Sequence, residues 1–301
     1  MSNNRRAILL MLVFVGLWAA IEILAWQVLQ RYSPYQVVWT RYAVHLLLML
    51  LIFGWREPAA LVRTRRPVFQ LLRSLLMLVM PASWVMGMQA GLPGDAVMGV
   101  FWISPLLILA LGALFLRERM PLAIWLATLL AGVGALLVHP LHSLPPPHLL
   151  VYPLAMAASF SAYVVMTRAL RGEATRANLF YTALGVFLAL SPFMPRLWQW
   201  PAPADLAVMV AVGVLGCLTL YALDRSTAAA PAGLSAPVLY MQVALTVSLL
   251  IALGVWKAGA LPLHVAAGVC LIAGVAAFVW LRESRWRLRD GHDMPGVAAP
   301  R

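Results

Sequence analysis

Charged residues are scarce in this chain. Only 11% of its 301 residues are Asp, Glu, Lys or Arg, whereas a soluble domain carries about 25%. So few charges cannot cover the surface of a globule in water, and the mean hydropathy of +0.88 agrees. The long apolar runs also lack the alternation of polar and apolar residues found in β-barrel strands. The composition therefore predicts an all-α polytopic membrane protein surrounded by a lipid bilayer.

Sequence motifs of hydrolytic and metal chemistry are also missing. HExxH, GxSxG, Walker A and CxxC patterns do not occur. The two cysteines, Cys217 and Cys270, lie in apolar runs, where we expect neither a structural disulfide nor a metal site. The sequence thus predicts no metal, no cofactor and no enzymatic activity. The net charge of +12 is expected to reflect Arg in cytoplasmic loops rather than nucleic-acid binding.

The clearest structural signal lies between residues 101 and 138. Two apolar runs, each free of charge, are joined by the turn Arg117-Glu118-Arg119-Met120. A helix of ~20 residues rises ~30 Å, enough to cross the hydrocarbon of a bilayer. The pair therefore predicts an antiparallel helical hairpin with its turn in water.

The whole chain divides into ten such apolar runs with short linkers. The N-terminal run continues to about Leu29 without a clear cleavage site, so we expect it to be retained rather than removed as a signal peptide. The predicted spans are 7–29, 35–53, 68–90, 94–116, 120–138, 149–167, 177–194, 206–223, 234–256 and 262–281.

The distribution of Lys and Arg predicts the orientation. With a cytoplasmic N-terminus, 17 of the 22 basic residues fall on the inside, and only Arg31, Arg196 and Lys257 fall outside. Arg41 and Arg73 lie within spans. Basic residues accumulate in cytoplasmic loops, so we predict a multi-pass protein of the plasma (inner) membrane with both termini in the cytoplasm.

Ten spans divide into two halves of five, and an odd number per half requires opposite orientations. We predict a first repeat over residues 1–143, a second over 144–282, and a cytoplasmic tail over 283–301. Small residues spaced by four occur in span 5 (Ala127, Ala131, Ala135) and in span 10 (Ala266, Cys270, Gly274), a spacing that permits close helix contact. Inverted repeats with a site near the membrane midplane are typical of secondary transporters.

Several segments, in this order and spacing, resemble the ten-helix EamA branch of the drug/metabolite transporter superfamily. Pro105 followed by Glu118 is similar to the family's fourth helix, and Arg41 to its second-helix arginine. Arg73-Ser74-Leu75 is similar to its third-helix opening, and residues 236–242 (APVLYMQ) to its ninth helix. The ninth-helix segment resembles a subgroup that includes S-adenosylmethionine carriers of intracellular bacteria. The second half departs from the family pattern where Val255-Trp256-Lys257 replaces the expected glutamate.

Glu22 and Arg41 are the leading candidates for a functional site. Both lie roughly 9–10 Å below the outer surface at ~1.5 Å per residue, and a charge facing lipid would cost ~2.5–3.5 kcal/mol. They should face a wet cavity, as a gate or substrate contact, or form a structural ion pair. His45 lies one turn from Arg41 on the same face and would be either a proton relay or a core histidine.

Arg73 lies about five residues inside span 3. It would extend its head group to the interface, hold an anionic substrate or gate, or pack at the helix end. Asp95 is expected to cap span 4, and Asp224 and Arg225 to form a charge pair at a helix end.

Aromatic residues deep within spans could line a cavity. These are Trp18, Trp84, Trp102 and Tyr240, with Gln89 and Gln242 as polar partners, although each could equally serve packing. Pro105, Pro231 and Pro237 can bend their helices.

Together these features favour a secondary transporter of a small organic or amphipathic solute, working by alternating access as a monomer or homodimer. The alternatives are a membrane-embedded enzyme acting on lipid, for which a clustered catalytic group is lacking, and a structural membrane subunit without transport.

Overall fold

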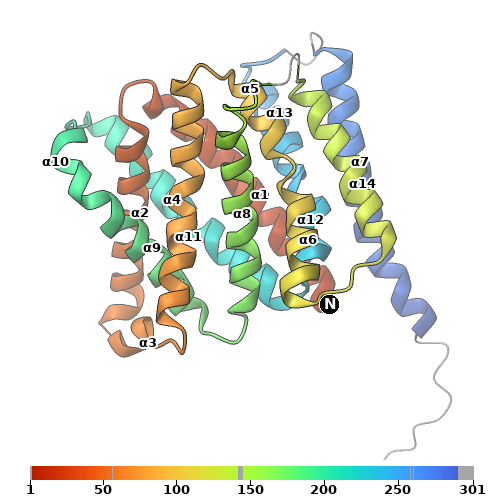
Figure 1. Ribbon diagram of the computed structural model, residues 1–301, viewed down its shortest axis with the longest axis horizontal. Coiled ribbons are helices and arrows are strands. Elements are labelled where there is room, and N and C mark those ends of the chain that lie inside the picture. The colour runs from red at the N-terminus through yellow and green to blue at the C-terminus, as the bar shows by residue number, and fades with distance from the viewer. Residues whose placement is uncertain (1, 56, 142–144, 258, 260, 291–301) are drawn as a thin grey trace, which may run out of the picture.

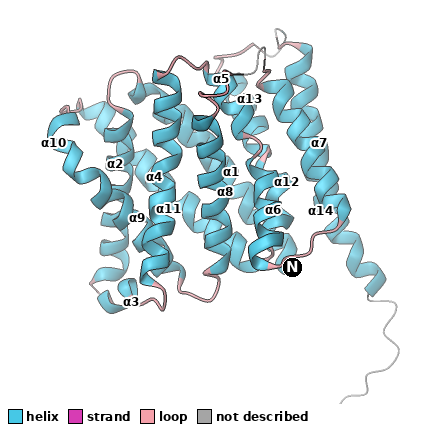
Figure 2. Cartoon of the chain, in the orientation of Figure 1, coloured by secondary structure: helices cyan, strands magenta, loops and turns pink. Residues whose placement is uncertain are grey.

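The computed structural model describes residues 2–55, 57–141, 145–257, 259 and 261–290. Within these residues the chain is helical with no strand (Figure 1, Figure 2). The helices are α1 (Asn3–Leu29), α2 (Pro34–Met49), η1 (Leu50–Gly54), α3 (Pro58–Val62), α4 (Pro67–Gln89), α5 (Gly94–Phe101), α6 (Ser104–Leu116), α7 (Leu122–Val138), α8 (Val151–Ala169), α9 (Thr175–Leu190), η2 (Ser191–Phe193), α10 (Met194–Leu197), α11 (Pro203–Ala229), α12 (Ala232–Leu239), α13 (Met241–Ala252) and α14 (Leu263–Asp290).

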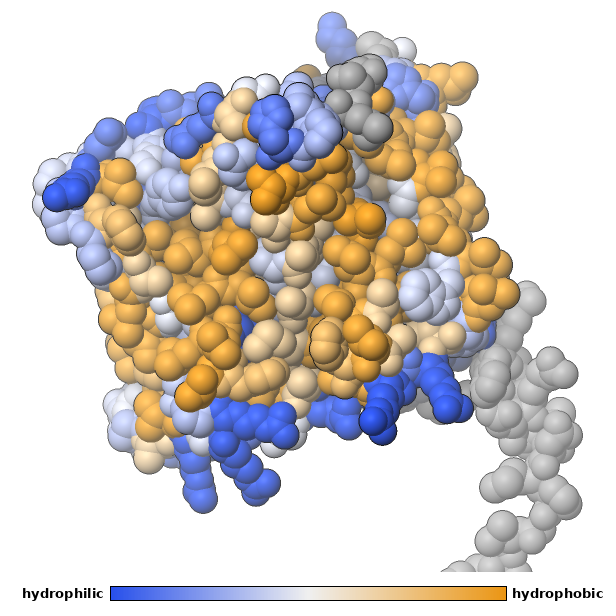
Figure 3. Space-filling model, in the orientation of Figure 1, coloured by the Kyte–Doolittle hydropathy of each residue, from blue (hydrophilic) through white to orange (hydrophobic). Residues whose placement is uncertain are grey.

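The described helices follow the predicted spans closely, so the all-α polytopic prediction is confirmed. Eight of the helical segments are long and apolar enough to cross a membrane, and α7 is a shorter apolar helix of 17 residues. Helix α8 is less apolar because it carries buried Ser159, Ser161 and Thr167. Figure 3 shows a broad apolar belt between two polar margins, as expected for a protein that spans a bilayer. The count of ten crossings stays a prediction.

Two predicted spans are interrupted rather than continuous. Span 94–116 divides into α5 and α6 at Trp102, and span 234–256 divides into α12 and α13 at Tyr240. At the first break the Leu106 amide donates to the carbonyl of Ile103, which leaves the Trp102 carbonyl without its usual helical donor. The Tyr240 hydroxyl donates to that carbonyl at 2.8 Å. The side chain at the second break is therefore hydrogen-bonded to the backbone at the first.

Helix α11 lies between α1 and α2 and packs closely against both, while α1 and α2 make few contacts with each other. The short loop after Leu29 therefore does not make α1 and α2 neighbours along their length. Helix α4 has the same relation to α8 and α9. Each long crossing helix, α4 or α11, thus fills the space between two helices of the other half.

Helices α7 and α14 form a pair at one end of the assembly (Figure 1). Their closest approach is at Gly134 and Gly268, where a Cβ on Gly268 would lie 2.5 Å from the Gly134 carbonyl oxygen. The predicted stripe on α7 is buried, but Cys270 and Gly274 on α14 are exposed. The spacing-by-four prediction was therefore wrong for α14, whose contact face carries Gly268 and Ile272 instead.

This glycine contact leads to a stability prediction. Gly268→Ala should destabilise the protein by about 1–3 kcal/mol, the usual cost of overpacking, because the opposing atom belongs to the backbone and cannot rotate away. Gly274→Ala, on the same helix with no atom within 4 Å of its new Cβ, is the matched control. Thermal unfolding in detergent micelles checks both. Equal melting temperatures for the two variants would contradict the contact.

Candidate functional site

A cavity lies among α1, α2, α4, α8 and α11, near the middle of these helices. It has a volume of about 50 Å³, enough for a few water molecules but well below the ~300–1,000 Å³ of sites that enclose a whole organic ligand. Its walls are Phe14, Trp18, Ile21, Arg41, Met77, Met80, Phe160, Tyr163, Thr219, Leu220 and Leu223. The cavity could therefore hold only the end group of a larger solute in this conformation.

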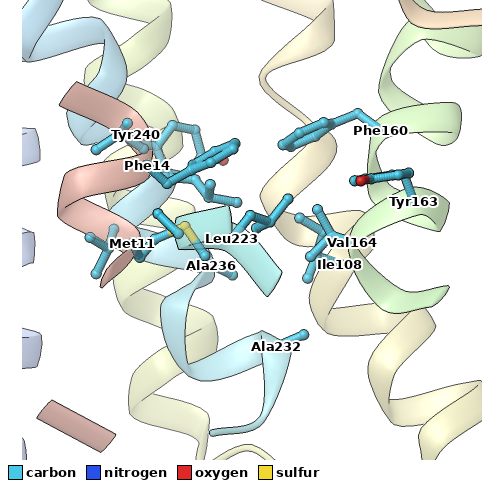
Figure 4. Close-up of a cluster of buried hydrophobic side chains, with 14 of the residues drawn as sticks. Met11, Phe14, Ile108, Phe160, Tyr163, Val164, Leu223, Ala232, Ala236 and Tyr240 are labelled. Atoms are coloured by element: carbon cyan, nitrogen blue, oxygen red, sulfur yellow. The ribbon is translucent and has the colours of Figure 1, made fainter. Parts of the chain in front are cut away.

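One wall of the cavity is aromatic. In Figure 4 the rings of Phe14 and Phe160 point toward each other, and the Tyr163 hydroxyl points into the same region above Leu223. The ring centroid of Trp18 lies 5.6 Å from that of Phe14 and 5.3 Å from that of Phe160. Trp18 also contacts Trp102, with centroids 6.2 Å apart. Large planar surfaces of this kind suit a flat or cationic group on a solute.

Among the residues that the structure describes, Arg41 is the only charged one that lines this cavity. Its guanidinium lies over the ring of Tyr42, 5.5 Å from the centroid, and against Gly216 of α11, where a Cβ would approach Nε to 2.5 Å. The Nε atom is buried without a hydrogen-bonding partner. The residues that the structure describes contain no ion pair with Arg41 and none between Arg41 and Glu22.

Glu22 has partners from α13 instead. Gln242 donates to the Glu22 carboxylate through Nε2, and the Thr246 hydroxyl lies 3.5 Å from the same oxygen. Gln242 also donates to Thr246 at 3.2 Å. This polar triad joins α1 to the segment just after the break at Tyr240, so a movement at that break would act directly on Glu22.

The remaining predicted site residues occupy different places. Trp102 and Tyr240 lie at the two helix breaks, with ring centroids 5.6 Å apart. His45 is buried and stacked on Tyr42 with a centroid distance of 6.2 Å, and its Nε2 has no partner among the described residues. Trp84 packs against the core and does not line the cavity. Of the predicted site residues, only Trp18 and Arg41 line the cavity, and the other residues of its wall were not predicted from the sequence.

Arg73 lies at the centre of a buried polar network and does not extend to the interface. Only 1% of the residue is exposed. Its guanidinium donates to Gln70, Thr167, Thr182 and the carbonyl of Asn178, at 2.7–2.9 Å, and lies 5.0 Å from the centre of the Tyr163 ring. The network therefore joins α4, α8 and α9. We call the face of the protein at which α1 begins the N-face, and the network lies between the cavity and this face.

Asp224 continues this network into α11. It is 5% exposed and accepts a hydrogen bond from Asn178 Nδ2 at 2.7 Å, while Asn178 Oδ1 accepts from Gln70 at 2.6 Å. The expected pair of Asp224 with Arg225 at a helix end was wrong, because α11 continues to Ala229. The predicted cap at Asp95 was also wrong, since Asp95 contacts His139 at 3.2 Å and makes no capping bond.

A second polar cluster lies at the N-face, and the sequence prediction missed its partners. Glu118 accepts from Arg168 Nε at 2.8 Å and from the backbone amide of Ala232 at 3.1 Å. Arg168 also donates to the carbonyls of Thr227 and Ala228. We call these five residues the N-face latch. It binds the end of α6 to the end of α8 and to the α11–α12 connection, using the unpaired backbone groups of the helix ends.

Comparison with known proteins shows which transporters this chain resembles. The EamA-like transporter family matches residues 5–139. The chain is 25% identical to an S-adenosylmethionine uptake transporter of Rickettsia conorii over 62% of this chain and 63% of that protein. It is 24% identical to the Rickettsia prowazekii protein of the same name over 72% and 73% of the two chains. An uncharacterized transporter of Vibrio cholerae is 28% identical over 68% of this chain and 66% of that one.

A crystal structure of a protein with no function in its description agrees with the fold. It superposes with a TM-score of 0.79 over 93% of this chain and 98% of the other, at 19% identity. Residues 5–139 match the EamA-like transporter family, which confirms the predicted resemblance to that family. The match to the Rickettsia conorii protein spans slightly less than two thirds of that protein's length.

Proposed function

We propose that the protein is a secondary transporter that moves a small organic metabolite across the plasma membrane by alternating access. The observation that carries this proposal is a central cavity, partly aromatic and lined also by Arg41, lying above two polar networks near the N-face. A cavity at mid-depth is what a carrier needs, and polar contacts that can break and re-form suit a gate. The described residues contain no group of three or more His, Cys, Asp or Glu able to hold a metal ion.

The architecture of two inverted halves is part of this proposal. Most pairs of helices in contact have a corresponding pair in contact when each helix is replaced by its counterpart. The counterparts are α1 and α8, α2 and α9, α4 and α11, α5–α6 and α12–α13, and α7 and α14. Thus α1 contacts α11 as α8 contacts α4, and α1 contacts α13 as α8 contacts α6. Both interrupted helices are also exchanged. This correspondence supports a first repeat over 1–143 and a second over 144–282, whose boundary at 143–144 lies outside the described residues.

Some contacts have no counterpart under this exchange, and the one between α6 and α12 bears on which face is closed. Helices α6 and α12 pack against each other near the N-face, whereas their counterparts α13 and α5 make no comparable contact at the opposite face. The N-face latch lies beside the α6–α12 contact. With the N-face in the cytoplasm, as the basic residues favour, this conformation is closed to the cytoplasm and less tightly packed on the outside.

The substrate class follows from the wall and from the relatives. The names of the Rickettsia proteins describe uptake of S-adenosylmethionine, a solute with a flat aromatic base, a sulfonium cation and an amino-acid end group. An aromatic wall facing an arginine is compatible with such a solute, and we infer a metabolite with an aromatic or cationic body. Proteoliposomes of the purified protein should accumulate at least one of a panel of radiolabelled metabolites that includes S-adenosylmethionine. Uptake equal to that of empty liposomes for the whole panel would refute transport.

The latch leads to a second prediction. Glu118→Gln removes the negative charge that accepts from Arg168 and from the Ala232 amide. Hydrogen bonds to a charged group are worth about 1.5–3 kcal/mol, against about 1 kcal/mol for neutral ones, so the latch is weakened. Hydrogen exchange at the start of α12 should therefore accelerate by roughly tenfold or more, and uptake should fall. Glu57→Gln is the control, because it removes a carboxylate of the same kind from a largely exposed pair with Arg176. Unchanged exchange in the Glu118 variant would show that the latch does not hold the N-face closed.

A further inference from the structure

We propose that Arg41 is the receptor for an anionic end group, a carboxylate or phosphate, on the transported solute. This inference rests on the proposed transport function and names a chemical requirement of its substrate. The starting point is a charge without a counterion. Arg41 lines the cavity, and the part of the chain that the structure describes offers it no ion pair.

The other charges buried in the helices are accommodated by protein groups. Arg73 donates four hydrogen bonds to the network that ends at Asp224, and Arg168 pairs with Glu118. Asp205 pairs with Arg31. Arg41 differs because its neighbours are the ring of Tyr42 and the backbone of Gly216. The Nε atoms of both Arg41 and Arg73 are buried without a partner, but the terminal nitrogens of Arg73 are hydrogen-bonded to protein groups. A guanidinium in the surroundings of Arg41 binds an anion strongly, since no carboxylate among the described residues pairs with it.

The position of Arg41 is built into the packing. Helix α2 crosses α11 at Gly213 and Gly216, and side chains at either position would collide with Val44 or with Arg41. Gly216 therefore provides the space in which the guanidinium lies beside the cavity. Thr219, one turn further along α11, lines the same cavity, but its hydroxyl donates to the carbonyl of Leu215 at 2.7 Å, which leaves Arg41 as the donor for the anion.

The aromatic lining specifies the rest of the solute. Trp18, Phe14, Phe160 and Tyr163 line the same cavity as the arginine. The small cavity accepts the anionic group in the described conformation, and the body of the solute would occupy space that opens as the helices separate. The site therefore selects a solute that carries an anion at one end and an aromatic or cationic body at the other.

The test compares paired probes that differ in the anion. Three pairs are suitable: S-adenosylmethionine and its decarboxylated analogue, tryptophan and tryptophan amide, and adenosine 5′-monophosphate and adenosine. Binding to the purified protein in nanodiscs is followed by thermal shift titration. The wild type should bind at least one anionic member ~10-fold or more tightly than its partner, and the pair that responds distinguishes carboxylate from phosphate.

Substitutions of Arg41 test whether its guanidinium causes this preference for the anionic probe. Arg41→Gln should abolish it, Arg41→Lys should restore part of it, and Arg196→Gln, which removes an exposed charge remote from the cavity, should leave it unchanged. Should Arg41→Gln fail to fold, Gly216→Ala displaces the flexible guanidinium without removing its charge and should reduce the preference by a similar factor.

Two results would overturn the inference while transport stands. One is uptake of a solute that has no anionic group, with equal affinity for both members of every pair, and the other is an unchanged preference in Arg41→Gln. Binding of chloride or inorganic phosphate as tightly as the organic anion would also overturn the inference, because the site would then recognise charge without an organic solute. Failure of the proposed function would look different, since no probe of any charge would be taken up by proteoliposomes.

Discussion

Arg73→Met should lower the free energy of unfolding by about 2–4 kcal/mol, which makes it the most destabilising single substitution that we expect in this chain. The arginine donates four hydrogen bonds within a nearly inaccessible network. Side-chain hydrogen bonds in membrane proteins average about 0.6 kcal/mol and reach about 1.7. Methionine fills similar space but leaves Gln70 Oε1 without its donor, while Thr167 and Thr182 keep their bonds to the carbonyls of Tyr163 and Asn178. Unfolding in a denaturing detergent series measures the loss.

The control for Arg73 is Arg171→Met. Arg171 lies at the same face of the protein but is exposed, so its replacement should change stability by no more than about 0.5 kcal/mol. Equal effects of the two substitutions would mean that the loss of positive charge, rather than the loss of the buried network, determines stability. The Arg73 result would then give no support to a structural role for the network.

Helix positions were predictable from the sequence because lipid imposes a simple rule on them. Each crossing segment must satisfy its own backbone hydrogen bonds and present apolar side chains, so hydropathy alone located the runs from α1 to α14. The breaks at Trp102 and Tyr240 were not predictable in this way, since an apolar run looks the same whether its helix is continuous or interrupted. Pro105 and Pro237 were the available signals, and they gave no position for the break.

The partners of the charged residues were the harder part of the site. Depth along a helix can be counted, and it placed Glu22 and Arg41 at a similar level. The direction in which each side chain points depends on which helix packs alongside, and α11 separates α1 from α2. Glu22 therefore meets Gln242, 220 positions away in the sequence. The same reasoning missed Gly216, whose role becomes visible only once Arg41 is known to lie against it.

Glu22 lies at the contact most directly affected by movement of the interrupted helix α12–α13. Its carboxylate accepts from Gln242 and lies beside Thr246 on α13, while Trp18, one turn earlier on α1, lines the cavity. A change at the cavity can thus reach the break through a single turn of α1. A carboxylate can only accept hydrogen bonds, so any separation of α1 from α13 leaves a charge that must find another partner.

Glu22→Gln should reduce uptake into proteoliposomes to less than about a tenth of the wild-type rate while leaving the melting temperature nearly unchanged. The glutamine oxygen can still accept from Gln242, so the stability cost should stay within about 1 kcal/mol, close to that of one neutral hydrogen bond. The negative charge, however, is gone from the contact that must open and close during transport. Thr246→Val, which removes only the weaker partner at 3.5 Å, should retain most of the uptake. A Glu22→Gln variant that transports at the wild-type rate would show that the triad has only a structural role.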